Sequence, residues 1–285
     1  MAFARHATGP TADLRALLSQ VHPVFMLPPV AASLFGAVTA VGAAWDLSVA
    51  AGHVIAVFLA VYTAHLKDGY VDFYVRGEDD DHPLTRRGIW IAIGGAALGF
   101  GGCLLLLGIW GGLGAVAITA PLWAIGFLHA PQFDTHPVTT TLGYPLGIAL
   151  AILGGHYVQA GTLSVGVVGF ATVFVLVLTG VKIIDDEQDY AYDRSIEKRT
   201  VSVVLGRRPA RRLAMGLFGA GLGLLLVGGI VGPFPPAVPV AAVVFGLVAA
   251  LALRRPPTVA TMLLVRGAYL FLAVLVAVVW LRPLS

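Results

Sequence analysis

Residues 165–200 read VGVVGFATVFVLVLTGVKIIDDEQDYAYDRSIEKRT, and this stretch decides the fold. Its first half carries no charge until Lys182, whereas its second half holds six acidic residues. About 20 consecutive apolar residues are enough for a helix to cross a bilayer. The stretch therefore predicts a membrane-spanning helix that runs directly into a strongly acidic segment.

The whole chain shares this apolar character. Of its 285 residues, 58% are hydrophobic and only 12% are charged, whereas about 25% of the residues in a soluble domain are charged. This composition excludes a soluble enzyme, a disordered protein and a typical nucleic-acid-binding protein. The partner that it does predict is the lipid bilayer.

Long intervals without charged residues predict the number of spans. Two of them hold one helix each, three are long enough for two helices and have glycine or proline near the middle, and the last continues past Arg266 as one more helix. The intervals are 16–45, 47–66, 88–133, 135–181, 213–253 and 256–265. The sequence thus predicts an all-α polytopic membrane protein. We expect a single domain, residues 1–285, with nine transmembrane helices bundled around a central apolar cavity under a cytoplasmic polar cap.

Lysine and arginine placement predicts the orientation. Sixteen of the 18 basic residues precede the first predicted span or follow an even-numbered one. Loops rich in these residues stay in the cytoplasm. We therefore expect a multi-pass protein of the cell membrane whose N-terminus and acidic segments are cytoplasmic.

Twelve of the 15 acidic residues fall in two segments, within the loops at about 67–88 and 182–212. Several of these acids are four residues apart, and residues at that spacing share one helix face. Hard carboxylate oxygens without histidine or cysteine suit Mg²⁺. The predicted metal ligands are Asp68, Asp72, Asp185, Asp189 and Asp193.

Basic residues accompany both acidic segments. Lys67 and Arg86 lie near the first, and Lys198 and Arg199 lie in the second. Arg and Lys neutralise the phosphate oxygens that a metal leaves uncovered. The combination predicts a diphosphate site at the mouth of an apolar cavity. There, Asp68, Asp72, Asp185 and Asp189 would be catalytic, because a metal stabilises a departing diphosphate and an acceptor captures the resulting allylic cation.

The second segment resembles a motif of the UbiA-type intramembrane prenyltransferase family. Asp185-x3-Asp189-x3-Asp193 is followed by Glu197-Lys198-Arg199-Thr200 and then by Leu205-Gly206, with Glu197 where the family usually has glycine. In the first segment, Asp68 stands at the family's asparagine and Asp72 at its second aspartate, but Arg76 stands at its third aspartate. The resemblance implies nine helices, Mg²⁺, a polyprenyl diphosphate donor and a hydrophobic acceptor.

The sequence leaves several classes of acceptor open. Residues 154–161, GGHYVQAG, resemble the menaquinone branch of this family, which prenylates dihydroxynaphthoate. However, residues 127–134, FLHAPQFD, lack the tyrosine and basic residues usual in the family's corresponding loop. A glycerol phosphate, another quinone precursor and a carotenoid-type acceptor stay open, and the candidate acceptor-binding residues are His129, Asp134 and Arg266.

An alternative function uses the same carboxylates differently. A cation transporter would place acids near the middle of the membrane, between broken helices. In such a protein Lys198-Arg199-Thr200 would have no evident use.

Overall fold

In the computed structural model, residues 3–41 and 44–281 are described, and they form helices and no β-strand. Ala4 and Leu84 make one isolated antiparallel bridge. The helices are α1 (Pro10–Leu18), α2 (Pro23–Val41), α3 (Leu47–Tyr70), η1 (Val71–Arg76), α4 (Arg86–Leu128), η2 (Phe133–Thr135), α5 (Pro137–Ala160), α6 (Val165–Gln188), α7 (Tyr190–Ser195), α8 (Val201–Leu205), α9 (Arg207–Val231), α10 (Pro239–Ala252) and α11 (Pro257–Leu281).

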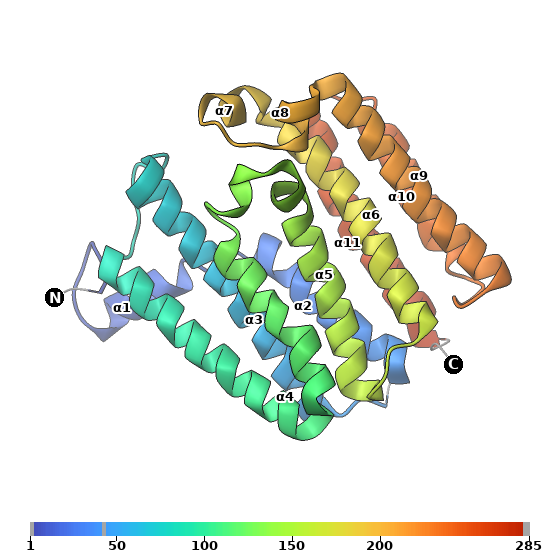
Figure 1. The fold of residues 1–285 in the computed structure, drawn as a ribbon, viewed down its shortest axis with the longest axis horizontal. Helices are drawn as coiled ribbons and strands as arrows, with labels where there is room; N and C mark the ends of the chain where they lie inside the picture. The colour runs from blue at the N-terminus through green and yellow to red at the C-terminus, as the bar shows by residue number, and fades with distance from the viewer. Residues whose placement is uncertain (1–2, 42–43, 282–285) are drawn as a thin grey trace.

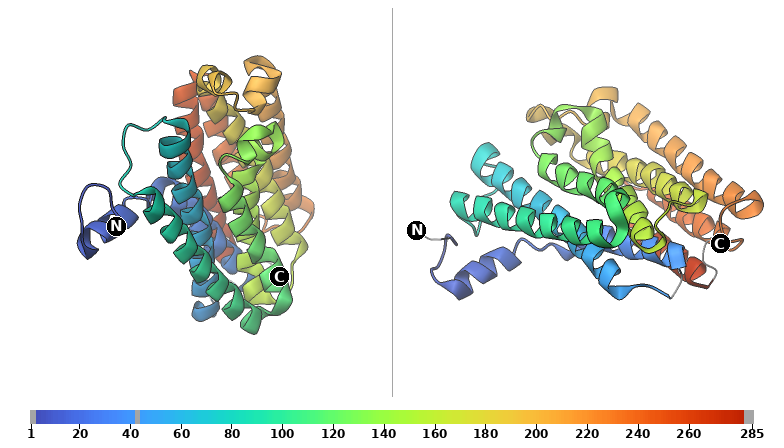
Figure 2. Two further views of the ribbon diagram at one scale, coloured as in Figure 1. Left: turned by 60° about the vertical axis from the view of Figure 1, so that its left-hand side comes forward. Right: turned by 60° about the horizontal axis from the view of Figure 1, so that its bottom comes forward.

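The long helices form one bundle (Figure 1). α3 packs against α4, α2 packs against α5, and α6 packs against α5, α9 and α11. α10 packs against α9 and α11, so the α9–α10 pair covers one side of the bundle. The short helix α1 lies outside the bundle, as both views in Figure 2 show.

Seven helices in the described ranges are long and apolar enough to cross a membrane. Nine were predicted, and the difference arises at two places. α4 is a single element of 43 residues in which Gly112 has non-helical backbone angles (φ 71°, ψ −171°), so the chain turns back there (Figure 1). α10 has only 14 residues, fewer than the roughly 20 that a full span requires.

The predicted breaks have clear local causes. Only glycine adopts the positive φ of Gly112 without strain, which explains why the turn occurs at the Gly111–Gly112 pair. Gly161 ends α5 in a left-handed conformation, and the Ser164 side chain then accepts a hydrogen bond from Val167 N–H at the start of α6. The proline-rich segment 232–236 separates α9 from α10.

Two glycines let α2 and α5 approach until their backbones touch. A Cβ atom on Gly36 would lie 2.1 Å from the carbonyl oxygen of Ile152, and one on Gly155 would lie 2.0 Å from that of Ser33. Small residues at such positions allow close helix packing in membranes. Phe35, the residue before Gly36, packs edge-on against Phe170 of α6 and joins α2 to the bundle core.

The acidic segments meet at one end of the bundle. η1 continues α3 beyond its last turn, η2 follows α4, and α7 and α8 follow α6 at the top of Figure 1. These three connections lie between consecutive long helices on the same side, so the fold brings together segments that are far apart in the sequence.

Candidate active site

A cavity of about 830 Å³ lies among α2, α3, α4, α5, α6 and α11. Much of its wall is apolar and includes Ala32, Val57, Leu122, Ile148 and Phe174. Acidic residues line it as well, and they belong to both motifs: Asp68, Asp72, Asp79, Asp81 and Asp185. One molecule with a charged head and a hydrocarbon tail therefore matches both kinds of lining.

α2 and α11 form one wall of this cavity. Val24 and Phe25 line it from α2, and Ala268 and Tyr269 line it from α11. The Tyr269 hydroxyl donates a hydrogen bond to the carbonyl oxygen of Val24. This bond joins two residues that are 245 positions apart.

The first motif is carried by the end of α3 and by η1. Asp68 and Asp72 both line the cavity, as expected from their spacing of one helical turn. η1 is a π-helical turn that ends at Gly77, whose left-handed conformation (φ 67°) lets the chain leave the helix. The predicted metal ligands of the first motif are thus placed together at the cavity.

Arg76 is the centre of an ion-pair network at the end of η1. Its guanidinium nitrogens lie 3.5 Å from Asp72 Oδ1, 3.7 Å from Glu78 Oε1 and 2.6 Å from Asp134 Oδ2. Nearby, His129 Nε2 lies 3.8 Å from Asp68 Oδ2. Both loop residues that we predicted for the acceptor, His129 and Asp134, therefore contact the first motif.

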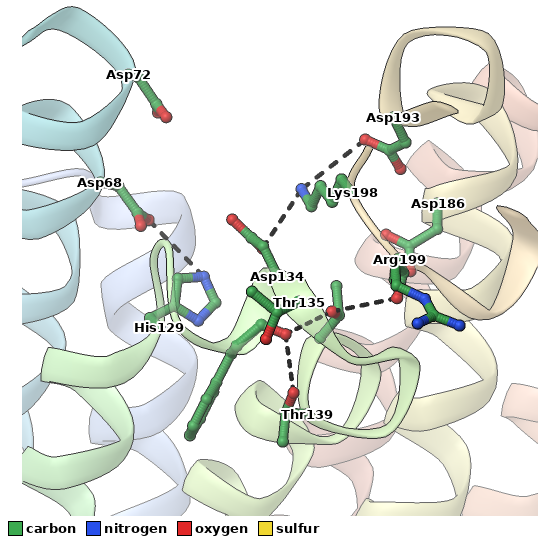
Figure 3. Close-up of polar contacts among 12 residues, drawn as sticks. Asp68, Asp72, His129, Asp134, Thr135, Thr139, Asp186, Asp193, Lys198 and Arg199 are labelled. Atoms are coloured by element: carbon green, nitrogen blue, oxygen red, sulfur yellow. Dashed lines mark hydrogen bonds and ion pairs between the residues drawn. The ribbon is translucent and has the colours of Figure 1, made fainter. Parts of the chain in front are cut away.

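Asp134 also contacts the second motif (Figure 3). Lys198 Nζ lies 4.0 Å from Asp134 Oδ1 and 3.9 Å from Asp193 Oδ1. The backbone N–H of Arg199 donates a 3.0 Å hydrogen bond to the Asp134 carbonyl oxygen. Asp134 thereby connects the two motifs.

The second motif starts inside α6 with a lysine between two aspartates. Lys182 Nζ lies 2.5 Å from Asp186 Oδ1 and 3.2 Å from Asp185 Oδ2, and Lys182 and Asp185 both line the cavity. Gln188 donates to the other oxygen of Asp185 at 3.0 Å. Asp185 therefore has a protein partner for each carboxylate oxygen.

Two carboxylate oxygens of the second motif have no partner among the described residues. Oδ2 of Asp186 and Oδ2 of Asp193 are buried and accept no hydrogen bond. Leaving a buried acceptor unpaired costs free energy, so a cation bound there would stabilise the site. Burial raises the pKa of Asp193 to about 6, although Lys198 acts in the opposite direction.

These residues fit Mg²⁺ in its usual mode. Mg²⁺ is commonly held by one or two carboxylates together with water and substrate phosphates. In the described ranges, no three His, Cys, Asp or Glu side chains already converge as a metal cluster. The acids instead form separate small groups, each of which matches such a partial ligand set.

The structure does not bring Asp189 to the cavity lining. We predicted that Asp185, Asp189 and Asp193 share one helix face, but α6 ends at Gln188 and Asp189 departs from helical geometry (φ −93°, ψ 9°). Because α7 starts a new helix, the spacing of four no longer places these residues in line. Asp189 is exposed, whereas Asp193 is buried.

All five predicted basic residues lie outside the cavity lining, including Lys198, which contacts Asp134 and Asp193. Lys67 is buried and donates to the Phe127 carbonyl oxygen, and Arg86 donates to the Tyr74 carbonyl oxygen and stacks on its ring. Arg199 is exposed, and its backbone, not its guanidinium, makes the contact with Asp134. Arg266 is exposed and is not among the residues of α11 that line the cavity, which include Ala268 and Tyr269.

Three polar residues of this region were absent from the predicted site: Arg76, Lys182 and Asp186. Lys182 precedes Asp185 and Asp186 by three and four residues, and this spacing is a signal for ion pairing on a helix. The spacing of four residues between Asp72 and Arg76 likewise indicates an ion pair on one helix face.

Comparisons with known proteins show likeness in structure. No protein-family profile matches the sequence, and no curated protein matches it. A structure described as digeranylgeranylglyceryl phosphate synthase in membranes superposes with a TM-score of 0.74 at 14% identity, over 93% of this chain and 98% of that one.

Two archaeal structures show the same likeness. A UbiA homologue from Aeropyrum pernix K1 gives a TM-score of 0.67 at 16% identity over 90% of this chain and 96% of its own. A UbiA homologue from Archaeoglobus fulgidus, bound to GPP and Mg²⁺, gives a TM-score of 0.66 at 16% identity over 94% of this chain and 99% of its own. The chain has the UbiA-type fold along nearly its whole length, as the sequence motifs implied.

Proposed function

We propose that this protein is a Mg²⁺-dependent prenyltransferase that moves a prenyl group from a polyprenyl diphosphate to a hydrophobic acceptor. The observation that carries the proposal is the cavity, whose wall is largely apolar and which is also lined by acids of both motifs. The Archaeoglobus fulgidus homologue of the same fold binds GPP and Mg²⁺, a ligand pair of this chemistry.

The proposed topology has nine membrane crossings. The two halves of α4, on either side of Gly112, count as two, and the short helix α10 counts as one. The N-terminus and both acidic motifs then lie in the cytoplasm, in agreement with the distribution of Lys and Arg. The whole chain forms one catalytic domain.

The metal-binding residues are proposed from both motifs. Asp68 and Asp72 line the cavity, and Asp193 offers a buried, unpaired oxygen, so these three are the primary candidates. Asp185 and Asp189 remain predicted ligands. Bound Mg²⁺ would supply charge stabilisation for the departing diphosphate. The chain itself contributes the apolar wall, which holds the prenyl tail and excludes water from the site of transfer.

The acceptor class is a lipid or a quinone precursor. The segment GGHYVQAG supports a menaquinone-type acceptor by sequence. In the structure, however, its residues His156 and Gln159 hydrogen-bond to Thr39 and to the backbone of Asp46, respectively, in helix packing at the other end of the bundle. A membrane lipid acceptor therefore stays equally open.

Product analysis tests this function. Purified protein is incubated with Mg²⁺, labelled geranylgeranyl diphosphate and a panel of aromatic and glycerol phosphate acceptors, and released diphosphate and prenylated product are measured. We expect product with the unmodified protein, at least a hundredfold less with Asp72→Ala, and an unchanged amount with Asp80→Ala, which alters an exposed residue. Full activity of Asp72→Ala would refute the proposal, and metal uptake by proteoliposomes without diphosphate release would identify a transporter.

A further inference from the structure

Arg76 places a positive charge where the acidic pattern of the first motif would continue. Asp68, Asp72 and position 76 are spaced by four residues, and the third of them is an arginine. Its side chain is 22% exposed and lies 3.5 Å from the carboxylate of Asp72, which lines the cavity. This chain thus holds a guanidinium directly beside its proposed donor site.

Asp134 bridges this guanidinium and a second cation. One of its oxygens faces Arg76 at 2.6 Å, and the other faces Lys198 at 4.0 Å. Figure 3 shows its carboxylate between the first motif on one side and Lys198 with Asp193 on the other. An anion with two oxygens between two cations is the arrangement that a phosphate group would also adopt.

Asp134 stands on a short connecting segment between two long helices. It lies in η2, a turn of three residues, and Lys198 lies in the loop between α7 and α8, whereas Arg76 ends a helix that continues α3. Asp72, Glu78 and Asp193 add further negative charge around the two cations. With Asp134 in place, the site repels an incoming anion unless that anion displaces Asp134 or brings a metal.

We propose that Arg76 and Lys198 form a direct binding site for the donor's diphosphate group, and that Asp134 occupies this site until the donor displaces it. This inference rests on the proposed function and deepens it: part of the diphosphate is held by the protein's own cations and not by metal. Asp134 is then a competing carboxylate, not an acceptor-binding residue. Its removal strengthens diphosphate binding, whereas removal of Arg76 weakens it.

The test measures binding of inorganic diphosphate to the purified full chain by calorimetry, in EDTA and again in Mg²⁺. In EDTA, we expect Arg76→Gln to weaken binding about tenfold, because it removes a charge-assisted hydrogen bond. Asp134→Asn should have the opposite effect and strengthen diphosphate binding about three- to tenfold. Arg76→Lys keeps the charge and loses no more than about threefold.

Matched controls make the same charge changes elsewhere. Arg208→Gln on α9 and Asp80→Asn in the loop before α4 alter exposed residues, so binding should follow the unmodified protein. If Arg76→Gln binds diphosphate like Arg208→Gln, or if Asp134→Asn does not exceed Asp80→Asn, the inference is wrong. These results would leave the proposed function intact, because that function is tested separately, by Mg²⁺-dependent diphosphate release and by its loss in Asp72→Ala. If Arg76→Gln does not fold, the inference is tested by the other two variants. Asp134→Asn must then bind diphosphate more tightly than the unmodified protein, and Arg76→Lys must stay within about threefold of it.

Discussion

Substituting Gly36 by alanine should force α2 and α5 apart. The new Cβ atom would lie 2.1 Å from the Ile152 carbonyl oxygen and 2.8 Å from the His156 backbone nitrogen, and ordinary contact begins at 3.4 Å. The helices must therefore separate by about 1.3 Å at this point. Neither neighbouring atom can rotate away, because both belong to the backbone of α5.

The change in the free energy of unfolding caused by Gly36→Ala is the sum of two opposing effects. Overpacking of this kind costs about 1–3 kcal/mol, and the upper end applies because backbone atoms must shift. Within a helix, alanine is more stabilising than glycine by about 1 kcal/mol, which offsets part of this cost. The net loss is about 2 kcal/mol in the free energy of unfolding, which corresponds to a fall of roughly 4–8 °C in Tm for a chain of this size.

The assay is thermal unfolding of purified protein in one detergent, followed by tryptophan fluorescence and by the loss of monodisperse protein in gel filtration. Gly94→Ala is the matched control, because no atom lies within 4 Å of its added Cβ on α4 and its Tm should stay level or rise. If Gly36→Ala melts together with Gly94→Ala, the close approach of α2 and α5 described above is wrong.

Three further outcomes are expected. Lys182→Met should lower stability by about 3 kcal/mol, because it leaves the 2% exposed Asp186 without its cation, and adding Asp186→Asn should restore much of the loss in the same melting assay. The pKa of Asp193 is raised to about 6, so in EDTA the folded protein takes up a proton as pH falls through about 6. Tm should therefore rise from pH 7.5 to pH 5 relative to the Tm of Asp193→Asn. Parallel plots of Tm against pH for the two proteins would contradict this. Removing Mg²⁺ with EDTA should abolish prenyl transfer and its readdition should restore it, whereas activity that persists in EDTA would exclude the proposed metal role.

Local sequence patterns predicted the features that depend on local physics. The apolar intervals, the break at Gly112 and the end of α5 at Gly161 follow from hydrophobicity and from backbone angles that glycine tolerates. Asp68 and Asp72 share the cavity because α3 continues unbroken up to η1. In each case, residues within a few positions of one another determine the result.

Tertiary contacts determined the rest. Asp134 meets Arg76, 58 positions away, and Lys198 on another loop, and no periodicity connects these three. The pattern of the second motif failed at Asp189 because it assumes a continuous helix, whereas the chain leaves α6 there. The position of Arg266 outside the cavity lining depends on which side of α11 faces the cavity, and the sequence alone does not show that side.

The bond between Tyr269 and the Val24 carbonyl has a consequence for biosynthesis. Because these residues are 245 positions apart, the wall made by α2 and α11 cannot exist while the intervening chain is still being synthesised and inserted. Until then, the cavity proposed to hold the prenyl tail stays open on that side. A ribosome-bound chain that lacks α11 would therefore leave the Val24 carbonyl oxygen without its Tyr269 partner, and the cavity would gain its last wall only when α11 arrives.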